Sequence, residues 1–201
     1  MKKIIIFLSA LTIILSISAC DDSSVNNPPN TIDDFPNSGG TTWKYIVTDS
    51  LSGSTDTLKV TVDGNTTISN GQDVTIWQLA FTDSMDSNYV LIDHDSVKIF
   101  EDKEFLTNNI KLVFPLQVGS TWKGDYITTD SFYVSGTTQL STPAGTFNDV
   151  YIIERFYGGF NEYNKMTIWF VNNVGIVKLY KRDVTLGFLN EVRELIEYDI
   201  N

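Results

Sequence analysis

The chain of 201 residues carries 25 acidic and 14 basic residues, a formal net charge of −11, with 42% hydrophobic and 12% aromatic residues. So acidic a chain repels phosphate backbones, which argues against a nucleic acid partner. Its single cysteine, Cys20, excludes an internal disulfide, so stability must come from a hydrophobic core, for which the length and composition suffice.

The N-terminal segment has the pattern of a secretory signal. Lys2 and Lys3 precede an uncharged run at residues 4–18 (IIIFLSALTIILSIS). The run is shorter than the roughly 20 apolar residues of a membrane-spanning helix, and the chain turns polar directly after it. We therefore predict that residues 1–19 are a signal peptide. Their removal leaves 182 of the 201 residues with 12 basic and 25 acidic side chains, a formal charge of −13.

The end of this segment, Ile17-Ser18-Ala19-Cys20, resembles the lipobox of bacterial lipoproteins. The resemblance implies that Cys20 is acylated with chains such as palmitate before the signal is cut away. Each buried methylene contributes about 0.8 kcal/mol, so two or three acyl chains would anchor the mature N-terminus durably at a membrane. The alternative is a chance free thiol after an ordinary signal peptide.

A polar segment follows the cysteine. The sequence DDSSVNNPPNTIDD (21–34) contains two prolines and four aspartates, so we predict that residues 20–34 are the lipidated cysteine and a flexible tether. Asp21 and Asp22 resemble two different address signals, one for retention at the inner membrane and one for export to the cell surface. We predict a lipid-anchored protein of the cell envelope, with the outer membrane or the cell surface preferred over the inner membrane.

The rest of the chain contains an internal repeat. The strings FPNSGGTTWKYIVTDS (35–50) and FPLQVGSTWKGDYITTDS (114–131) share eleven identities, among them Trp43 with Trp122. A second match aligns 89–100 with 169–180, and a weaker one aligns 73–81 with 149–157. The period of about 80 residues is too long for a solenoid. We predict one β domain over 35–201, made of two tandem repeats, 35–113 and 114–201.

Both repeats have the two-residue period of half-buried strands. TLKVTV (57–62) alternates and is followed by DGN (63–65), a turn signal. Other alternations fall at 74–81, 110–114, 132–134 and 150–157, and near the end Val192, Ile196, Tyr198 and Ile200 share one parity. Only DKEFLTNN (102–109) could form a helical turn or two. We predict an all-β, mainly antiparallel fold, packed either as a sandwich or as an open barrel.

The repeated tryptophans have two interpretations. In the first, each Phe-Pro, glycine and Thr-Trp-Lys run opens the first strand of its unit, and the tryptophan enters the core. In the second, Trp43 and Trp122 are a pair of ligand-binding platforms on which a sugar or another flat molecule stacks.

Residues able to support catalysis are few. The single histidine, His94 in DHDS, has the context of a hairpin turn rather than of a catalytic or metal centre. Glu154, Glu162, Glu191, Glu194 and Glu197 could supply the paired carboxylates of a glycosidase, but their spacing selects no pair. Asp83 and Asp86 lack the spacing of a calcium loop. We assign no catalytic residue, no metal and no cofactor.

Two further resemblances concern the β domain. STPAGTFNDVYIIE, followed by WFVNNVGIVK, resembles a run in uncharacterised exported bacterial β-domains, and the predicted shape is loosely similar to the half-barrels of periplasmic lipoprotein carriers. We predict a membrane-anchored, non-enzymatic binding or structural module with a protein or glycan partner at the envelope. The alternatives are a glycan-active hydrolase with paired carboxylates and a periplasmic carrier of an apolar ligand.

Overall fold

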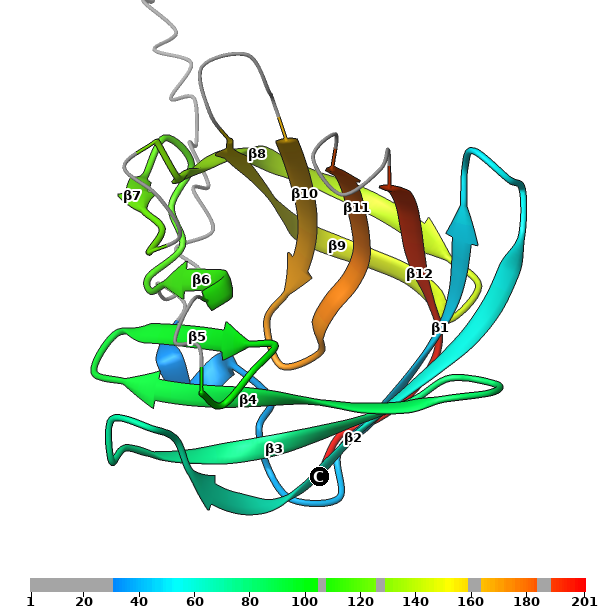
Figure 1. The fold of residues 1–201 in the computed structure, drawn as a ribbon. Helices are drawn as coiled ribbons and strands as arrows, with labels where there is room; N and C mark the ends of the chain where they lie inside the picture. The colour runs from blue at the N-terminus through cyan, green and yellow to red at the C-terminus, as the bar shows by residue number, and fades with distance from the viewer. Residues whose placement is uncertain (1–30, 105–107, 126–128, 159–163, 184–188) are drawn as a thin grey trace, which may run out of the picture.

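The computed structural model describes residues 31–104, 108–125, 129–158, 164–183 and 189–201. The predicted all-β fold is confirmed, with a single short 3-10 helix, η1 (Ile32–Asp34), among these residues (Figure 1). None of the described helical residues forms a segment long and apolar enough to cross a membrane. The strands are β1 (Thr42–Asp49), β2 (Thr55–Thr67), β3 (Asp73–Ala80), β4 (Met85–Asp93), β5 (Ser96–Phe100), β6 (Asn108–Val113), β7 (Thr121–Lys123), β8 (Ser131–Thr142), β9 (Gly145–Tyr157), β10 (Asn164–Val171), β11 (Gly175–Asp183) and β12 (Leu189–Asp199).

All twelve strands belong to one antiparallel sheet in the order β6-β5-β4-β3-β2-β1-β12-β11-β10-β9-β8-β7. Two six-stranded meanders are therefore joined where β1 pairs with β12. The sheet curls until its edge strands, β6 and β7, come near each other (Figure 1). Of the two predicted architectures, the open barrel is the observed one and the sandwich is wrong. The predicted repeat boundary falls between β6 and β7, and the duplication itself stays a prediction.

Side chains rather than a backbone ladder bridge the seam between β6 and β7. Trp122 Nε1 donates to the carbonyl of Lys111 at 2.9 Å, and Lys111 Nζ lies 3.2 Å from Asp125 Oδ1. Further along β6, the guanidinium of Arg155 donates to the carbonyl of Asn109. These contacts satisfy β6 carbonyls that a continuous ladder would otherwise pair.

The two copies of the repeated motif form the same local structure. Gly40 and Gly119 have φ angles of 87° and 91°, a region that favours glycine. Their amides donate to the carbonyls of Val62 and Val134 respectively, both at 2.9 Å. The strands that follow differ, because β1 has eight residues and β7 only three.

One end of the barrel is closed by the segment that precedes β1. Phe35 is buried and stacks between Trp77 and Phe170, with ring centroids 5.7 and 6.2 Å away. Trp77 Nε1 donates to Asn37 Oδ1 at 2.7 Å, which ties the same segment to β3. The η1 helix lies at this end, beside the β10–β11 turn, where Asn173 N donates to the carbonyl of Asp34.

Because of two β-bulges, the observed strand boundaries and inward-facing residues differ from those expected from the sequence. DGN at 63–65 is not a turn, because β2 continues through it with a register shift between Val62 and Asn65, and Gly64 has φ 79°. The chain reverses later, at residues 68–72, where Gly71 N donates to the carbonyl of Ile68.

In β12 the register shifts between the partners of Lys44 and Tyr45, so Ile196 lies in a bulge. The shared parity expected near the C-terminus is therefore wrong: Leu195 is the fully buried residue, and Tyr198 is 40% exposed. The bulge turns Arg193 and Glu191 towards the barrel interior. The expected helical turn at 102–109 falls partly on residues 105–107, outside the described residues, and Asn108 already begins β6.

Candidate functional site

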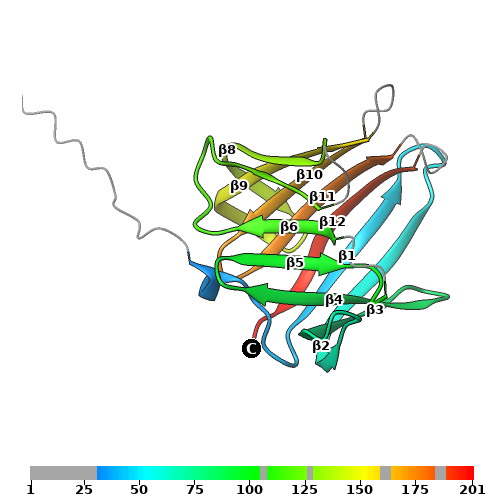
Figure 2. The same cartoon turned by 60° about the vertical axis from the view of Figure 1, so that its left-hand side comes forward.

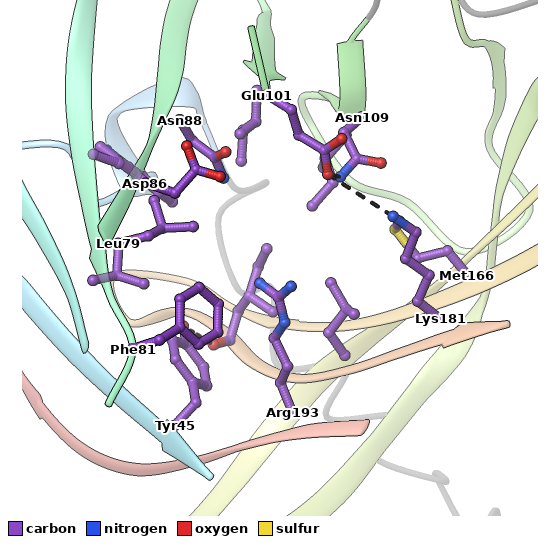
Figure 3. Close-up of a pocket in the computed structure, with 16 residues that line it drawn as sticks. Tyr45, Leu79, Phe81, Asp86, Asn88, Glu101, Asn109, Met166, Lys181 and Arg193 are labelled. Atoms are coloured by element: carbon purple, nitrogen blue, oxygen red, sulfur yellow. Dashed lines mark hydrogen bonds and ion pairs between the residues drawn. The ribbon is translucent and has the colours of Figure 1, made fainter. Parts of the chain in front are cut away.

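The barrel interior holds a cavity of about 310 Å³ (Figure 3). Its lining comes from both meanders, and its apolar part includes Trp77, Leu79, Ile99, Ile110, Met166 and Leu179. These residues occupy inward positions of β3, β5, β6, β10 and β11, because alternate side chains of a strand face the same side. The cavity therefore depends on closure of the sheet and exists in neither meander alone.

The cavity lies towards the end of the barrel opposite the Phe35 segment. Along β1 the inward residues run from Trp43 at the closed end through Tyr45, which lines the cavity, to Val47. Beyond the cavity, the inward side of β1, β2 and β12 continues into an open hollow of about 400 Å³ lined by Val47, Asp49, Asp56, Asp83 and Glu191, among others. The interior thus changes from apolar to acidic along the barrel axis.

Four charged side chains line the cavity near its open side. Asp86 lies near the start of β4 and Glu101 directly follows β5, while Lys181 and Arg193 come from β11 and β12. Glu101 Oε1 lies 3.8 Å from Lys181 Nζ and accepts a hydrogen bond from Asn109 Nδ2. Arg193 Nε donates to Glu191 Oε1. In Figure 3 the Arg193 guanidinium and the Lys181 ammonium both extend into the space between the strands.

Sheet register places the two cations side by side. Lys181 is paired with Glu191, and Leu179 is paired with Arg193 across the β11–β12 ladder. Lys181 and Arg193 are therefore diagonal neighbours on the same face, a relationship that typically separates Cα atoms by about 7–8 Å. Long side chains from such positions can converge on one small group.

Tyr45 supplies a buried phenol to the same wall. Its hydroxyl donates to the carbonyl of Ile176 at 2.8 Å. Burial raises the pKa of this phenol far above its ordinary value, and the positive charge of Arg193 offsets part of the increase. Tyr45 is therefore neutral at physiological pH and acts as a hydrogen-bonding part of the apolar wall.

Two carboxylates of the acidic hollow, Asp49 and Asp56, accept hydrogen bonds from neighbouring residues. Asp49 accepts hydrogen bonds from Leu51 N and Ser52 Oγ, which lower the pKa of its carboxyl. Asp56 accepts from Thr82 Oγ1 and from Thr57 N, and its pKa is lowered for the same reason. Within the described ranges, no group of three or more His, Cys, Asp or Glu residues is arranged to hold a metal ion. These carboxylates cap turns and strand ends.

The two predicted tryptophans lie apart from the cavity. Trp43 is 2% exposed, packs against Trp77 with ring centroids 4.9 Å apart, and donates from Nε1 to the carbonyl of Val174 at 2.6 Å. Trp122 is half-buried at the β6–β7 seam and stacks on Phe132 at 5.6 Å. This environment is that of folding determinants, and a ligand-binding role for Trp43 and Trp122 stays a prediction. Cys20 lies outside the described residues.

The candidate carboxylates do not gather at one site. Glu154 and Glu194 are bonded to Lys165 and Lys178, each at 2.7 Å, on the sheet face opposite the cavity. Glu191 faces inward, Glu197 is exposed, and Glu162 lies outside the described residues. His94 lies in the β4–β5 hairpin turn, as expected, with φ 53° and its side chain 92% exposed.

Sequence reasoning missed the charged lining of the cavity. A signal for Lys181 was present in the sequence. Val177 and Leu179 are buried, and Lys181 is the next residue in the same alternation, so a charged side chain faces inward there. Arg193 carried no such signal, since the bulge at Ile196 reverses the parity that its neighbours indicate. Asp86 and Glu101 come from strand ends, where alternation carries little information.

Comparison with known proteins gives no family assignment. The chain matches no model of a protein family, and it matches no curated protein. Among solved structures, it is similar to an inferred exported protein with a YmcC-like fold from Bacteroides fragilis (14% identity, TM-score 0.45, 82% of this chain and 98% of that one). It is also similar to an inferred lipoprotein from Parabacteroides distasonis (15% identity, TM-score 0.42, 83% and 98%).

Proposed function

We propose that this protein is a lipid-anchored envelope lipoprotein whose barrel binds one small amphipathic molecule without chemically changing it. The observation that carries the proposal is the cavity of about 310 Å³ enclosed by both meanders, apolar in its depth and charged at its open side. Small-molecule sites in proteins are typically concave, mostly apolar and equipped with a few polar groups that fix orientation.

The size of the cavity limits the ligand. At about 310 Å³ the cavity lies at the lower end of the roughly 300–1,000 Å³ that is typical of small-molecule pockets, so the ligand must be small. An eight-stranded barrel is just wide enough for its side chains or one small ligand, and a larger strand number leaves more interior to fill. Here the Phe35 segment fills one end and leaves the space beside Tyr45 and Met166 open.

The proposed anchoring rests on the sequence. Residues 1–19 would be the signal peptide, Cys20 the lipidated residue, and residues 20–34 the tether before the β domain. The first described residues lie at the end of the barrel that the Phe35 segment fills, beside the β10–β11 turn. A tether at that end leaves the cavity mouth unobstructed in the periplasm or at the cell surface. We favour the outer membrane or the cell surface over the inner membrane.

Among the alternatives, a carrier of an apolar ligand has specific support, because it requires an open interior. A hydrolase with paired carboxylates has less support, because Glu154 and Glu194 are ion-paired on the opposite sheet face from Glu191. A protein or glycan partner would have to use the outer surface of the barrel, and no described feature there selects one.

Binding is tested with three eight-carbon probes of similar size: octanoate, 1-octanol and octylammonium. The full chain in nanodiscs is titrated by calorimetry, with empty nanodiscs as the blank for partitioning into lipid. The blocking variant is Leu79→Trp, which adds an indole in the cavity wall, and the matched control is Tyr133→Trp, on an exposed position of β8.

We expect saturable binding of at least one probe, lost in Leu79→Trp and retained in Tyr133→Trp. The proposal is wrong if none of the three probes binds above the blank, or if the folded Leu79→Trp variant binds as the unmodified chain does.

A further inference from the structure

Two cations in the cavity wall have hydrogen-bonding capacity that the described residues do not use. The side chain of Lys181 is only 13% exposed, and the nearest carboxylate oxygen, on Glu101, lies 3.8 Å from Nζ, beyond hydrogen-bonding distance. Arg193 uses Nε for Glu191, while its terminal nitrogens make no hydrogen bond to a described residue and extend into the cavity (Figure 3).

Placing these cations inside the barrel has an energetic cost. A charged group taken from water destabilises the fold unless it is paired and hydrogen-bonded. The outer face shows the usual solution, because Lys165 and Lys178 each form an ion pair at 2.7 Å there. Lys181 and Arg193 face the cavity, where the carboxylate of Glu101 is 3.8 Å from Lys181 and Arg193 is paired with Glu191 through Nε alone.

The two carboxylates that line the cavity, Asp86 and Glu101, do not lack hydrogen-bond partners in the same way. The Glu101 side chain is 61% exposed and accepts from Asn109, and Asp86 is exposed and accepts from Ser87 N, so both have a partner and are open to solvent. An arriving cation would displace solvent from carboxylates that solvent already reaches. The side chains of Lys181 and Arg193 are only 13% and 26% exposed, so an arriving anion would supply acceptors to donors that solvent reaches less easily, which is the larger gain.

We propose that the cavity selects an anionic amphiphile, a small carboxylate with an apolar tail, whose head group is bound by Lys181 Nζ and the terminal nitrogens of Arg193. This inference rests on the proposed function and names its ligand class. The two cations are diagonal neighbours on β11 and β12, so one carboxylate can accept from both. The tail then lies against the apolar wall formed by Trp77, Leu79 and Met166.

Two acidic residues support this arrangement. Glu191 holds Arg193 through Nε and leaves the terminal nitrogens to the ligand. Glu101 lies 3.8 Å from Lys181 as its nearest carboxylate, and its exposed side chain can move into water when a ligand carboxylate replaces it. The exchange of one carboxylate for another leaves the charge balance at Lys181 unchanged.

The test compares octanoate, 1-octanol and octylammonium on the full chain in nanodiscs, and then octanoate on Lys181→Met. The methionine has a similar length and no charge. The matched control is Lys178→Met, which removes a lysine from the same strand but on the outer face. Thermal unfolding followed by circular dichroism verifies that both variants are folded.

We expect octanoate to bind roughly tenfold or more tightly than 1-octanol, the range for hydrogen bonds to a charged group. Lys181→Met should lose about the same factor for octanoate and leave 1-octanol unchanged, while Lys178→Met binds octanoate normally. Equal affinity for octanoate and 1-octanol, tighter binding of octylammonium, or an undiminished Lys181→Met would overturn the inference and leave the proposed function standing. Failure of all three probes would overturn both.

Discussion

Arg155 and Asp130 form a doubly hydrogen-bonded ion pair inside the barrel, with Nε–Oδ1 at 2.8 Å and Nη2–Oδ2 at 2.9 Å. Both side chains are almost fully buried. The guanidinium also lies over the rings of Phe132 and Tyr157, with its central carbon 5.2 and 4.4 Å from their centroids. Because Arg155 also donates to the carbonyl of Asn109, the pair joins β8 and β9 to β6 and helps to hold the seam closed.

Asp130→Ala should lower the free energy of unfolding by about 3–5 kcal/mol, because it leaves a buried guanidinium without its counter-ion. The measurement is urea unfolding at neutral pH. The control is Glu154→Ala, which removes the partly exposed pair with Lys165 and should cost no more than about 1 kcal/mol. Similar losses in the two variants would show that burial of the Arg155 pair does not matter.

Gly124→Ala tests how tightly Asp130 is held. A Cβ added at Gly124 would lie 1.9 Å from Asp130 Oδ2 and 2.6 Å from Oδ1. Because Arg155 fixes this carboxylate, we expect a loss of about 1–3 kcal/mol in the free energy of unfolding. Gly136→Ala, where an added Cβ meets nothing within 4 Å, should be neutral or slightly stabilising. An unchanged Gly124→Ala would mean that Asp130 moves freely.

Trp43→Phe separates the folding role of the repeated tryptophans from a ligand role. It removes the hydrogen bond to Val174 and should cost about 1–3 kcal/mol, because that carbonyl loses its partner near the core. Trp122→Phe, at the half-buried seam, should cost less. Octanoate affinity should be unchanged in both, since neither indole lines the cavity. Loss of binding in a stably folded variant would instead favour the stacking role predicted for Trp43 and Trp122.

The stability of the protein should fall above pH 10 in a way that depends on Tyr45. Burial raises the pKa of this phenol in the folded state, whereas an unfolded tyrosine ionises near pH 10. Between the two values the unfolded chain binds fewer protons, so the free energy of unfolding decreases as the pH rises. Comparison of urea midpoints at pH 9 and pH 11 should give a smaller decrease for Tyr45→Phe. Tyr133→Phe, at an exposed position, is the control and should behave as the unmodified chain does.

Cys20→Ala should abolish lipid anchoring, because no other cysteine is available for acylation. The measurement is metabolic labelling of cells with an alkyne-bearing palmitate analogue, followed by digestion of intact cells with an external protease. The unmodified protein should take up label and Cys20→Ala should not. Label retained in the variant would rule out the predicted lipid site, and the digestion shows whether the barrel is outside the cell or in the periplasm.

Much of the fold was predictable because short sequence patterns indicate the strands and turns. The alternation at 57–62 and 150–157, together with the turn at His94, indicated antiparallel strands correctly. Bulges were not predictable in the same way. At DGN and at Ile196 an extra residue reverses which side chains face inward, and the partner strand determines whether that residue is accommodated as a turn or as a bulge.

By itself the sequence determined the all-β class, the repeated motif and the acidic charge, because each depends on residues close together in the chain. Only the tertiary structure decided that β1 pairs with β12 and that the sheet closes into one open barrel around a cavity. Lys181 and Arg193 line that cavity together with Leu79 and Ile110, from strands far apart in the sequence. Such a site follows from sheet order and register, which are set by long-range pairing and not by the period of any single strand.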